Sequence, residues 1–184
     1  MSSKSEYTRN CISEALIRLL QKYPIDTITV SSLTKEANVS RSAFYNNYKS
    51  IEEVLLSAYK KAHHDAFHLK FEDEYYVFSD QYILDNIRFF DDNSKLLLAI
   101  YKWDLITFVA KKQTSMVIDY TTHYHDPIIQ KNSHYFMCFS NVSIFYTCQL
   151  WVINGKQETP EELFDMIKYF IKLRSDYENI QKKG

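Results

Sequence analysis

Hydrogen-bonding side chains are dense in the run SRSAFYNNYK, which spans residues 40–49. Arg41 and Tyr45 are four residues apart, so on a helix they share one face. The same spacing joins Ser42 and Asn46 on the outer side. A guanidinium can donate two hydrogen bonds to guanine, an Asn amide can pair with adenine, and a Ser hydroxyl can bond either base. These residue types in this pattern fit the major groove of double-stranded DNA.

Two side chains of the same run are better suited to the DNA backbone. Tyr45 and Lys49 can bond phosphates, which fixes the register of a protein on DNA without reading its sequence. Asn47 offers a second amide, so either Asn46 or Asn47 could pair with adenine. The run therefore predicts both base contacts and phosphate contacts.

The residues just before this run have the pattern of a tight turn between two helices. In a helix-turn-helix, one turn residue adopts a left-handed backbone, and an apolar residue after it fills the crossing between the helices. Asparagine tolerates this conformation better than most residues, so Asn38 followed by Val39 meets both requirements. Phe44 is then expected to hold the second helix on its support.

Several helices are needed to position these side chains. Apolar residues at three- and four-residue spacings predict the first helix, which ends near Pro24. Thr29 and Ser40 have the side chains of N-caps, and Ser50 with Glu53 has the spacing of a capping box. The expected helices span residues 6–23, 30–37, 40–47 and from 50 to beyond 62.

The run ITVSSLTKEANVSRSAFYNNYKSIEEVL resembles the DNA-binding domain of TetR-family transcriptional regulators, and the resemblance extends over residues 7–60. It implies an all-α protein, with a three-helix helix-turn-helix domain at residues 1–50 and a larger helical ligand-binding and dimerisation domain at residues 51–184. Matched by position, the DNA contacts of the family fall on Thr29, Ser31, Arg41, Ser42, Tyr45, Asn47 and Lys49, and helix geometry adds Asn46. Asn38 replaces the usual glycine, and Ile51 stands where many relatives carry a phosphate-binding lysine.

The rest of the chain is also expected to be helical, because two glycines and three prolines are too few for a turn-rich all-β fold. Residues 68–78 predict a helix end and a loop. Thr159, Pro160 and Glu162 supply the N-cap, first-turn proline and capping-box acid of a final helix, and Gly155 ends the helix before it. The expected helices span residues 80–91, 94–103, 104–124, 132–154 and 160–180.

Aromatic residues are abundant, with 15 Tyr, 12 Phe and 2 Trp. Most of them are expected in the core. A helical domain with many hydroxyl-tipped aromatic side chains could also enclose an apolar pocket with a few polar anchors. We expect residues 94–124 to form its walls, and the predicted contacts to a small apolar or aromatic ligand are Tyr101, Trp103, Phe108, Tyr120 and Phe139.

The last two expected helices indicate a dimer. The run SHYFMCFSNVSIFYTCQLWVI is apolar around much of a helix, and such a helix must be covered on both sides. Pairing with its copy across a two-fold axis would cover it and would present two reading helices to a palindrome. The predicted dimer contacts are Phe145, Trp151, Phe164, Ile167 and Ile171. The segment WVINGKQETPEEL resembles a subgroup that includes regulators associated with dihydroxyacetone kinase operons.

Signals for other chemistry are weak. The sequence contains no P-loop, no GxGxxG and no GxSxG motif, so we do not predict an enzyme. His64 and His68 could share a helix face and bind zinc or copper, but two ligands do not make a site, and we predict neither metal nor cofactor.

Compartment signals point to the cytoplasm. No apolar run approaches the ~20 residues of a membrane-spanning helix, and the polar start lacks the apolar region of a signal peptide. Cys11, Cys138 and Cys148 lack any C-x-x-C pairing, so we expect buried thiols in a reducing cytoplasm, with a redox sensor as the alternative.

The charge distribution agrees with an anionic partner at one end. Residues 1–62 hold nine Lys or Arg against six Asp or Glu, a net charge of +3, whereas the remainder has a net charge of -4. We therefore predict a homodimeric transcriptional regulator, a repressor, that binds a palindromic operator and is controlled by a small ligand. The alternative is a protein-interaction module or co-activator that retains the fold and acts mainly through a protein partner. A small helical enzyme is a more distant alternative.

Overall fold

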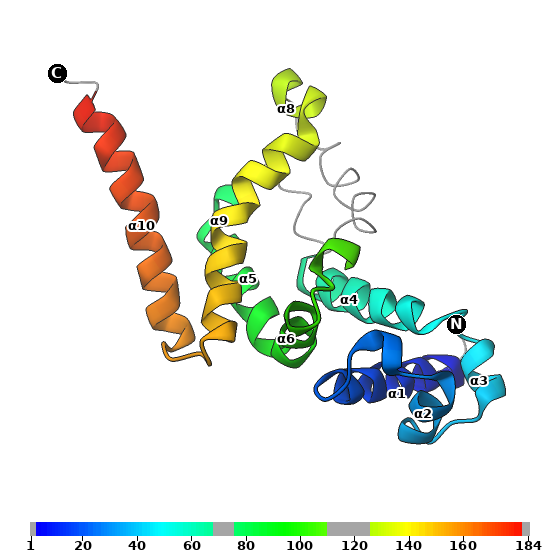
Figure 1. The fold of residues 1–184 in the computed structure, drawn as a ribbon. Coiled ribbons are helices and arrows are strands. Elements are labelled where there is room, and N and C mark those ends of the chain that lie inside the picture. Colours follow the sequence, from blue (N-terminus) through cyan, green and yellow to red (C-terminus); the bar gives the residue numbers. More distant parts are fainter. Residues whose placement is uncertain (1–2, 68–75, 110–125, 182–184) are drawn as a thin grey trace. The chain divides into compact units, whose positions relative to one another are not determined.

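The computed structural model describes residues 3–67, 76–109 and 126–181, and every regular element in these ranges is a helix (Figure 1). The predicted all-α class is confirmed. The chain forms two compact units. The first unit comprises Met1–Asp65 and Lys95–Thr114, and the second comprises Ala66–Ser94 and Ser115–Gly184. A later segment of the chain thus packs with the N-terminal helices, and residue 50, where we predicted a domain boundary, lies within the first unit.

The first unit is built on α1, which spans Ser3–Leu20 and buries Ile12, Leu16 and Leu20. The helix ends at Leu20 instead of residue 23, so Tyr23, which the apolar spacing had included, is 52% exposed. The following elements are η1 (Ile25–Thr27), α2 (Val30–Glu36), α3 (Arg41–Tyr45) and α4 (Ile51–Phe67). Helix α2 packs against both α1 and α3, which places the predicted turn on a helical support.

Helix α6 (Ser94–Lys102) brings the later segment to the first unit. Trp103 Nε1 donates a hydrogen bond of 2.6 Å to the carbonyl of Leu20, and Lys102 Nζ donates one of 2.9 Å to the carbonyl of Gln21. Gln21 Nε2 donates in return to the carbonyl of Lys95 at 3.0 Å. The bonds from Trp103 and Lys102 satisfy carbonyls at the end of α1 that have no helical partners.

In the second unit, α5 (Asp80–Asp92) packs against α9 (Ser133–Ile153) and α10 (Pro160–Gln181). Helix α5 buries residues on successive turns, among them Ile83, Ile87 and Phe90. The ring of Phe90 meets that of Phe145 edge-on at 4.8 Å between centroids. The short elements η2 (Tyr76–Phe78) and α8 (Pro127–Lys131) contact α9. Helix α8 was not predicted, and it begins because the Asp126 carboxylate caps two backbone N–H groups.

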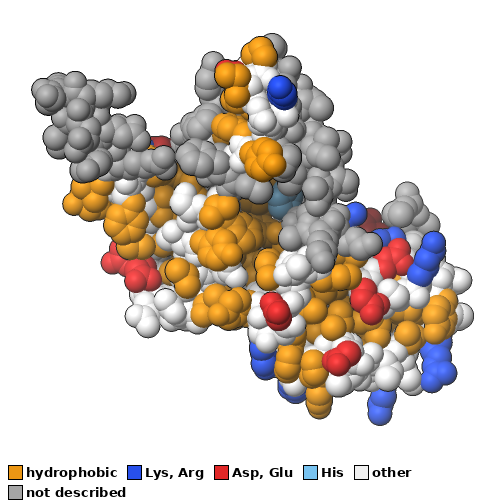
Figure 2. Space-filling view, turned by 45° about the horizontal axis from the view of Figure 1, so that its top comes forward, with side chains coloured by type: hydrophobic (Ala, Val, Ile, Leu, Met, Phe, Trp, Pro, Cys, Tyr) orange, Lys and Arg blue, Asp and Glu red, His pale blue; other side chains and the backbone are white. Residues whose placement is uncertain are grey.

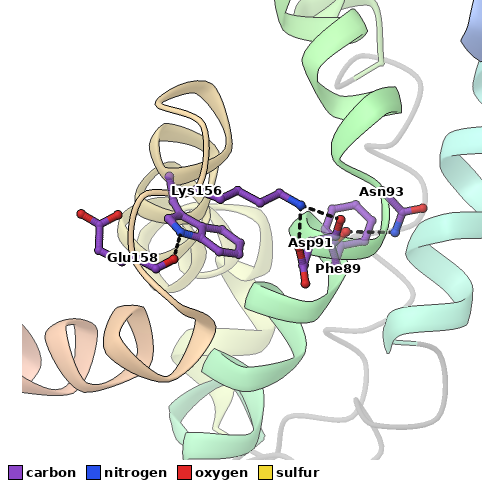
Figure 3. A network of polar contacts seen from close by, with 6 residues as sticks. Phe89, Asp91, Asn93, Lys156 and Glu158 are labelled. Atoms are coloured by element: carbon purple, nitrogen blue, oxygen red, sulfur yellow. Dashed lines mark hydrogen bonds and ion pairs between the residues drawn. The ribbon is translucent and has the colours of Figure 1, made fainter.

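The turn between α9 and α10 is fixed to α5 by polar contacts (Figure 3). Gly155 has φ 82° and Lys156 has φ 54°, which ends α9 at the predicted position. Lys156 Nζ reaches the carbonyl and the carboxylate of Asp91, and Trp151 Nε1 donates to the carbonyl of Glu158 at 2.9 Å. The predicted capping box that starts α10 is also present, with bonds of 2.8 and 3.2 Å between Thr159 and Glu162.

Candidate nucleic-acid interface

The turn between α2 and α3 has the geometry that the sequence predicts. Asn38 has φ 53°, in the left-handed region. Its N–H donates to the carbonyl of Lys35 at 3.2 Å, and the N–H of Val39 donates to the carbonyl of Thr34 at 3.0 Å. These bonds close the end of α2 and aim the chain into α3, so Asn38 takes the place that glycine usually has in such turns.

Capping side chains fix where α2 and α3 begin. Thr29 Oγ1 accepts from the N–H of Ser32 at 3.1 Å, and Ser32 Oγ accepts from the N–H of Thr29 at 3.0 Å, which is a complete capping box. Ser40 Oγ accepts from the N–H of Ala43 at 3.1 Å and caps α3. Both predicted N-caps are therefore confirmed, and α3 is shorter than expected because it ends at Tyr45.

The two sides of α3 have opposite character. Phe44 is fully buried, and its ring meets those of Tyr45 and Tyr48 at centroid distances of 5.3 and 6.2 Å. Tyr45 is 61% exposed. Arg41, Ser42 and Asn46 are exposed with it. The helix thus presents a polar face to solvent, as the spacing of these residues predicts.

Two of the exposed side chains have neighbours that orient them. Arg41 Nη2 donates a hydrogen bond of 2.8 Å to Ser31 Oγ, which connects α3 to the first turn of α2. The hydroxyls of Ser40 and Ser42 share a hydrogen bond of 2.9 Å. The guanidinium has five N–H donors, so the bond to Ser31 leaves four of them.

The side chain of Asn47, a predicted DNA contact, is engaged by two hydrogen bonds within the protein. Its Nδ2 donates to the carbonyl of Ala43 at 2.8 Å, and its Oδ1 accepts from Ser5 Oγ at 2.9 Å. The side chain is half-buried, whereas that of Asn46 is exposed. Asn47 Nδ2 therefore holds the side chain on α3 and Oδ1 ties it to α1, so of the two amides Asn46 is the one that faces solvent. Sequence reasoning missed this bond because nothing local connects Ser5 with residue 47.

The region around Lys49 shows how α4 begins without the family's usual lysine. Lys49 is exposed, and its backbone N–H donates to Glu53 Oε2 at 2.6 Å. Ser50 Oγ accepts from the N–H of Glu53 at 3.3 Å. The capping box is thus shifted, since Glu53 bonds the residue before the serine. Ile51 is half-buried, so its side chain contributes to packing.

Arginine contacts brace the helices behind this face. Arg9 Nη2 donates to Ser57 Oγ at 3.0 Å, and its guanidinium lies 4.8 Å from the centre of the Tyr48 ring. Arg18 and Glu36 form an exposed ion pair at 2.7 Å between α1 and α2. The exposed pair contributes little to stability. The Arg9 contacts join α1 to α4 and to Tyr48, which follows the end of α3.

Three of the predicted ligand contacts, Tyr101, Trp103 and Phe108, lie among the described residues. Tyr101 is 52% exposed, Trp103 bonds the end of α1, and Phe108 is half-buried. Tyr120 lies outside the described residues, as does the side chain of Phe139. A cleft of about 510 Å³ lies between α5 and α10. Its lining residues are Leu84, Ile87, Arg88, Asp91, Pro160, Glu161, Phe164 and Asp165.

Two of the five predicted dimer contacts are buried within their own unit. Trp151 and Ile167 are both 4% exposed, Phe145 packs on Phe90, and Phe164 lines the cleft, whereas Ile171 is 50% exposed. Helix α9 is apolar all round, so its sequence does not reveal which side the core takes. The apolar side chains that remain exposed are Tyr135, Val142, Tyr146 and Leu150 on α9, and Tyr169, Phe170, Ile171 and Leu173 on α10.

The two units also differ in the character of their surfaces. In the view of Figure 2, hydrophobic side chains cover much of the visible face of the second unit, and Lys and Arg side chains project mainly from the first. This contrast agrees with the charge distribution along the sequence. An anionic partner therefore fits the first unit better than the second.

The sequence analysis did not predict the buried polar groups of the second unit. Asp85 is 2% exposed, and its carboxylate accepts from Tyr76 Oη at 2.7 Å and from Gln81 Nε2 at 3.0 Å. Burial and this carboxylate raise the pKa of Tyr76. The four-residue spacing of Gln81 and Asp85 is the signal that could have found the pair. Burial also raises the pKa of Cys148 to about 12, so this thiol stays protonated.

The described residues contain neither a metal-ligand cluster nor a membrane-spanning helix. Across residues 3–67, 76–109 and 126–181, no three His, Cys, Asp or Glu side chains are grouped as metal ligands would be. His68, half of the considered histidine pair, lies outside these ranges. Within the same ranges, no helix is long and apolar enough to cross a bilayer.

The geometry described above is that of a helix-turn-helix domain, and comparison with known families agrees. Residues 12–58 match the family described as bacterial regulatory proteins, tetR family. The match contains α2, the turn, α3 and the start of α4. The N-terminal helix-turn-helix domain thus matches the TetR family, as the sequence resemblance predicted.

A solved structure extends the similarity to the remaining helices. The dihydroxyacetone kinase operon activator DhaS aligns with 91% of this chain and 95% of its own, with a TM-score of 0.57 and 19% identity. At this identity the likeness concerns the fold alone. No curated protein shows a significant sequence match.

Proposed function

We propose that the protein is a homodimeric transcriptional regulator that binds a palindromic operator through the exposed face of α3. The polar face opposite fully buried Phe44 is the observation that carries the proposal. Arg41, Ser42 and Asn46 read bases, and Tyr45 and Lys49 bond phosphates. Thr29 and Ser31 lie at the start of α2 and face the same groove. Asn47 supports α3 through its bonds to Ala43 and Ser5.

Titration of the protein with promoter DNA from its own gene tests this function. We expect affinity to fall steeply with salt, because bound Lys and Arg side chains release counterions from the DNA. We also expect two chains per duplex. The Arg41→Ala, Tyr45→Ala double variant should lose binding and keep its helical content, since both side chains are exposed. Absent or salt-insensitive binding to every fragment would exclude the proposal.

The proposed dimer forms through the exposed apolar side chains of α9 and α10. Such a patch marks an interaction surface, because leaving it in water is unfavourable. A small apolar or aromatic ligand controls the dimer by favouring one spacing of its two reading helices, which shifts the population away from the DNA-bound form. The operator is released when that ligand binds.

Repression is the predicted outcome of operator binding, because a bound dimer blocks access to an overlapping promoter. Activation is the second candidate, and the observation that favours it is the shared fold with an operon activator. In this second candidate, the protein retains the fold and acts mainly through a protein partner. Transcription of the bound promoter in vitro distinguishes the two: repression lowers transcript yield with the protein alone, whereas a co-activator changes it only when its partner is added.

A further inference from the structure

We propose that Ser31 is a positioning residue that holds the Arg41 guanidinium in its base-reading orientation. This inference rests on the proposed function. The hydrogen bond of 2.8 Å from Arg41 Nη2 to Ser31 Oγ joins two exposed side chains on two different helices. Ser31 thus acts through Arg41 and needs no contact with DNA of its own.

The hydroxyl groups at the start of α2 make two kinds of contact. Those of Thr29 and Ser32 form the capping box that begins the helix. The hydroxyl of Ser31 points instead to α3 and accepts from Arg41. Removing it therefore leaves the cap of α2 in place, so its effect on binding can be separated from an effect on helix stability.

The geometry of the guanidinium leaves one reading edge available. Two edges of this planar group can donate paired hydrogen bonds, and Nη2 carries one hydrogen on each edge. Ser31 accepts one of these hydrogens, so the other edge keeps its pair of donors for guanine. A flexible arginine would lose rotamer freedom when it binds, whereas an arginine already held has less to lose.

The test first needs a cognate duplex, which is selected from a pool of randomised double-stranded DNA. If no sequence is enriched by the wild-type protein, the proposed function itself fails. With an enriched duplex in hand, we expect Ser31→Ala to weaken binding about two- to tenfold, as for the loss of one hydrogen bond. Discrimination should be reduced at the one base pair that Arg41→Ala also affects.

A double-mutant cycle decides whether Ser31 works through Arg41. In the Arg41→Ala background, Ser31→Ala should change affinity by less than about 1.5-fold, because the group that it positions is gone. An equal loss in both backgrounds would overturn the inference and show that Ser31 contacts DNA itself. Ser31→Thr keeps the hydroxyl and should restore both affinity and discrimination.

Ser57→Ala is the matched control in the same unit. It also removes a serine hydroxyl that accepts a hydrogen bond from an arginine, at 3.0 Å from Arg9 Nη2. Arg9 lies on α1, and its guanidinium is engaged by Ser57 and the ring of buried Tyr48. We expect base discrimination to be unchanged in this variant, and a loss equal to that of Ser31→Ala would overturn the positioning role.

Discussion

Helices α3 and α10 both expose side chains, but of opposite kinds. The outer face of α3 is polar, and part of it is already engaged by neighbours, as in the bond from Arg41 to Ser31. Helix α10 instead carries three consecutive apolar residues, Tyr169, Phe170 and Ile171, each about half exposed. A polar face is stable in water and suits a partner that binds transiently. Exposed apolar side chains are unfavourable in water, so they favour a partner that stays bound. For the proposed function, this difference predicts reversible DNA binding and a persistent dimer.

The largest expected effect comes from the inner side of α3. Phe44→Ala should lower the free energy of unfolding by about 3–5 kcal/mol, because it leaves a cavity where a fully buried ring was. Urea denaturation followed by circular dichroism measures this change. Tyr45→Ala, the adjacent exposed ring, is the control and should cost less than about 1 kcal/mol. Similar losses in both variants would contradict the two-sided character of α3.

The second prediction concerns the apolar face of α10. Ile171→Asp should raise the dimer dissociation constant at least about 100-fold, since it buries an unpaired carboxylate in the interface. Sedimentation velocity over a range of concentrations measures the shift. Lys172→Asp is the neighbouring exposed control. If the wild-type chain is monomeric, or if both variants dimerise as it does, this face is not the interface.

Lowering the pH should destabilise the first unit through one histidine. Burial lowers the pKa of His63, in the first unit, to about 4, and the neighbouring His64 adds to the shift. The unfolded chain binds a proton near pH 6.5, whereas the folded chain does not until about pH 4. Stability is therefore complete above pH 6.5 and is lost as pH falls toward 4, by about 2 kcal/mol at pH 5.

Thermal unfolding at pH 7 and pH 5 measures this loss. His63→Gln removes the titrating group, so its stability should change less between the two pH values than that of the wild type. An unchanged pH dependence in the variant would assign the effect to the carboxylates instead.

The smallest expected effect lies in the turn before α3. Asn38→Gly should stabilise the first unit by about 0.5–1 kcal/mol, because glycine adopts φ 53° at lower cost than asparagine. Asn38→Ala should destabilise it by a similar amount. Chemical denaturation resolves both changes. If glycine destabilises the unit, the asparagine side chain contributes more than its backbone conformation.

Local signals made much of the first unit predictable. Thr29 and Ser40 cap the helices that they were expected to cap, and Asn38 has the expected left-handed backbone. Each of these features depends on residues within a few positions of each other. The family resemblance was carried by the same short run.

Contacts between distant parts of the chain were not predictable in this way. The bond between Trp103 and the end of α1 joins residues 83 positions apart, and it draws the end of α6 into the first unit. The orientation of α9 was also open, because a helix that is apolar all round gives no periodicity to place its core side. Trp151 was therefore assigned to an interface, although it is buried in its own unit.

The two tryptophans have a practical consequence for studying this protein. Trp103 belongs to the first unit and Trp151 to the second, and each indole N–H is bonded to a backbone carbonyl. Replacing either one with phenylalanine leaves a single tryptophan, which absorbs at longer wavelengths than the 15 tyrosines and can be excited apart from them. Emission from such a variant reports the melting of one unit at a time, without an added label.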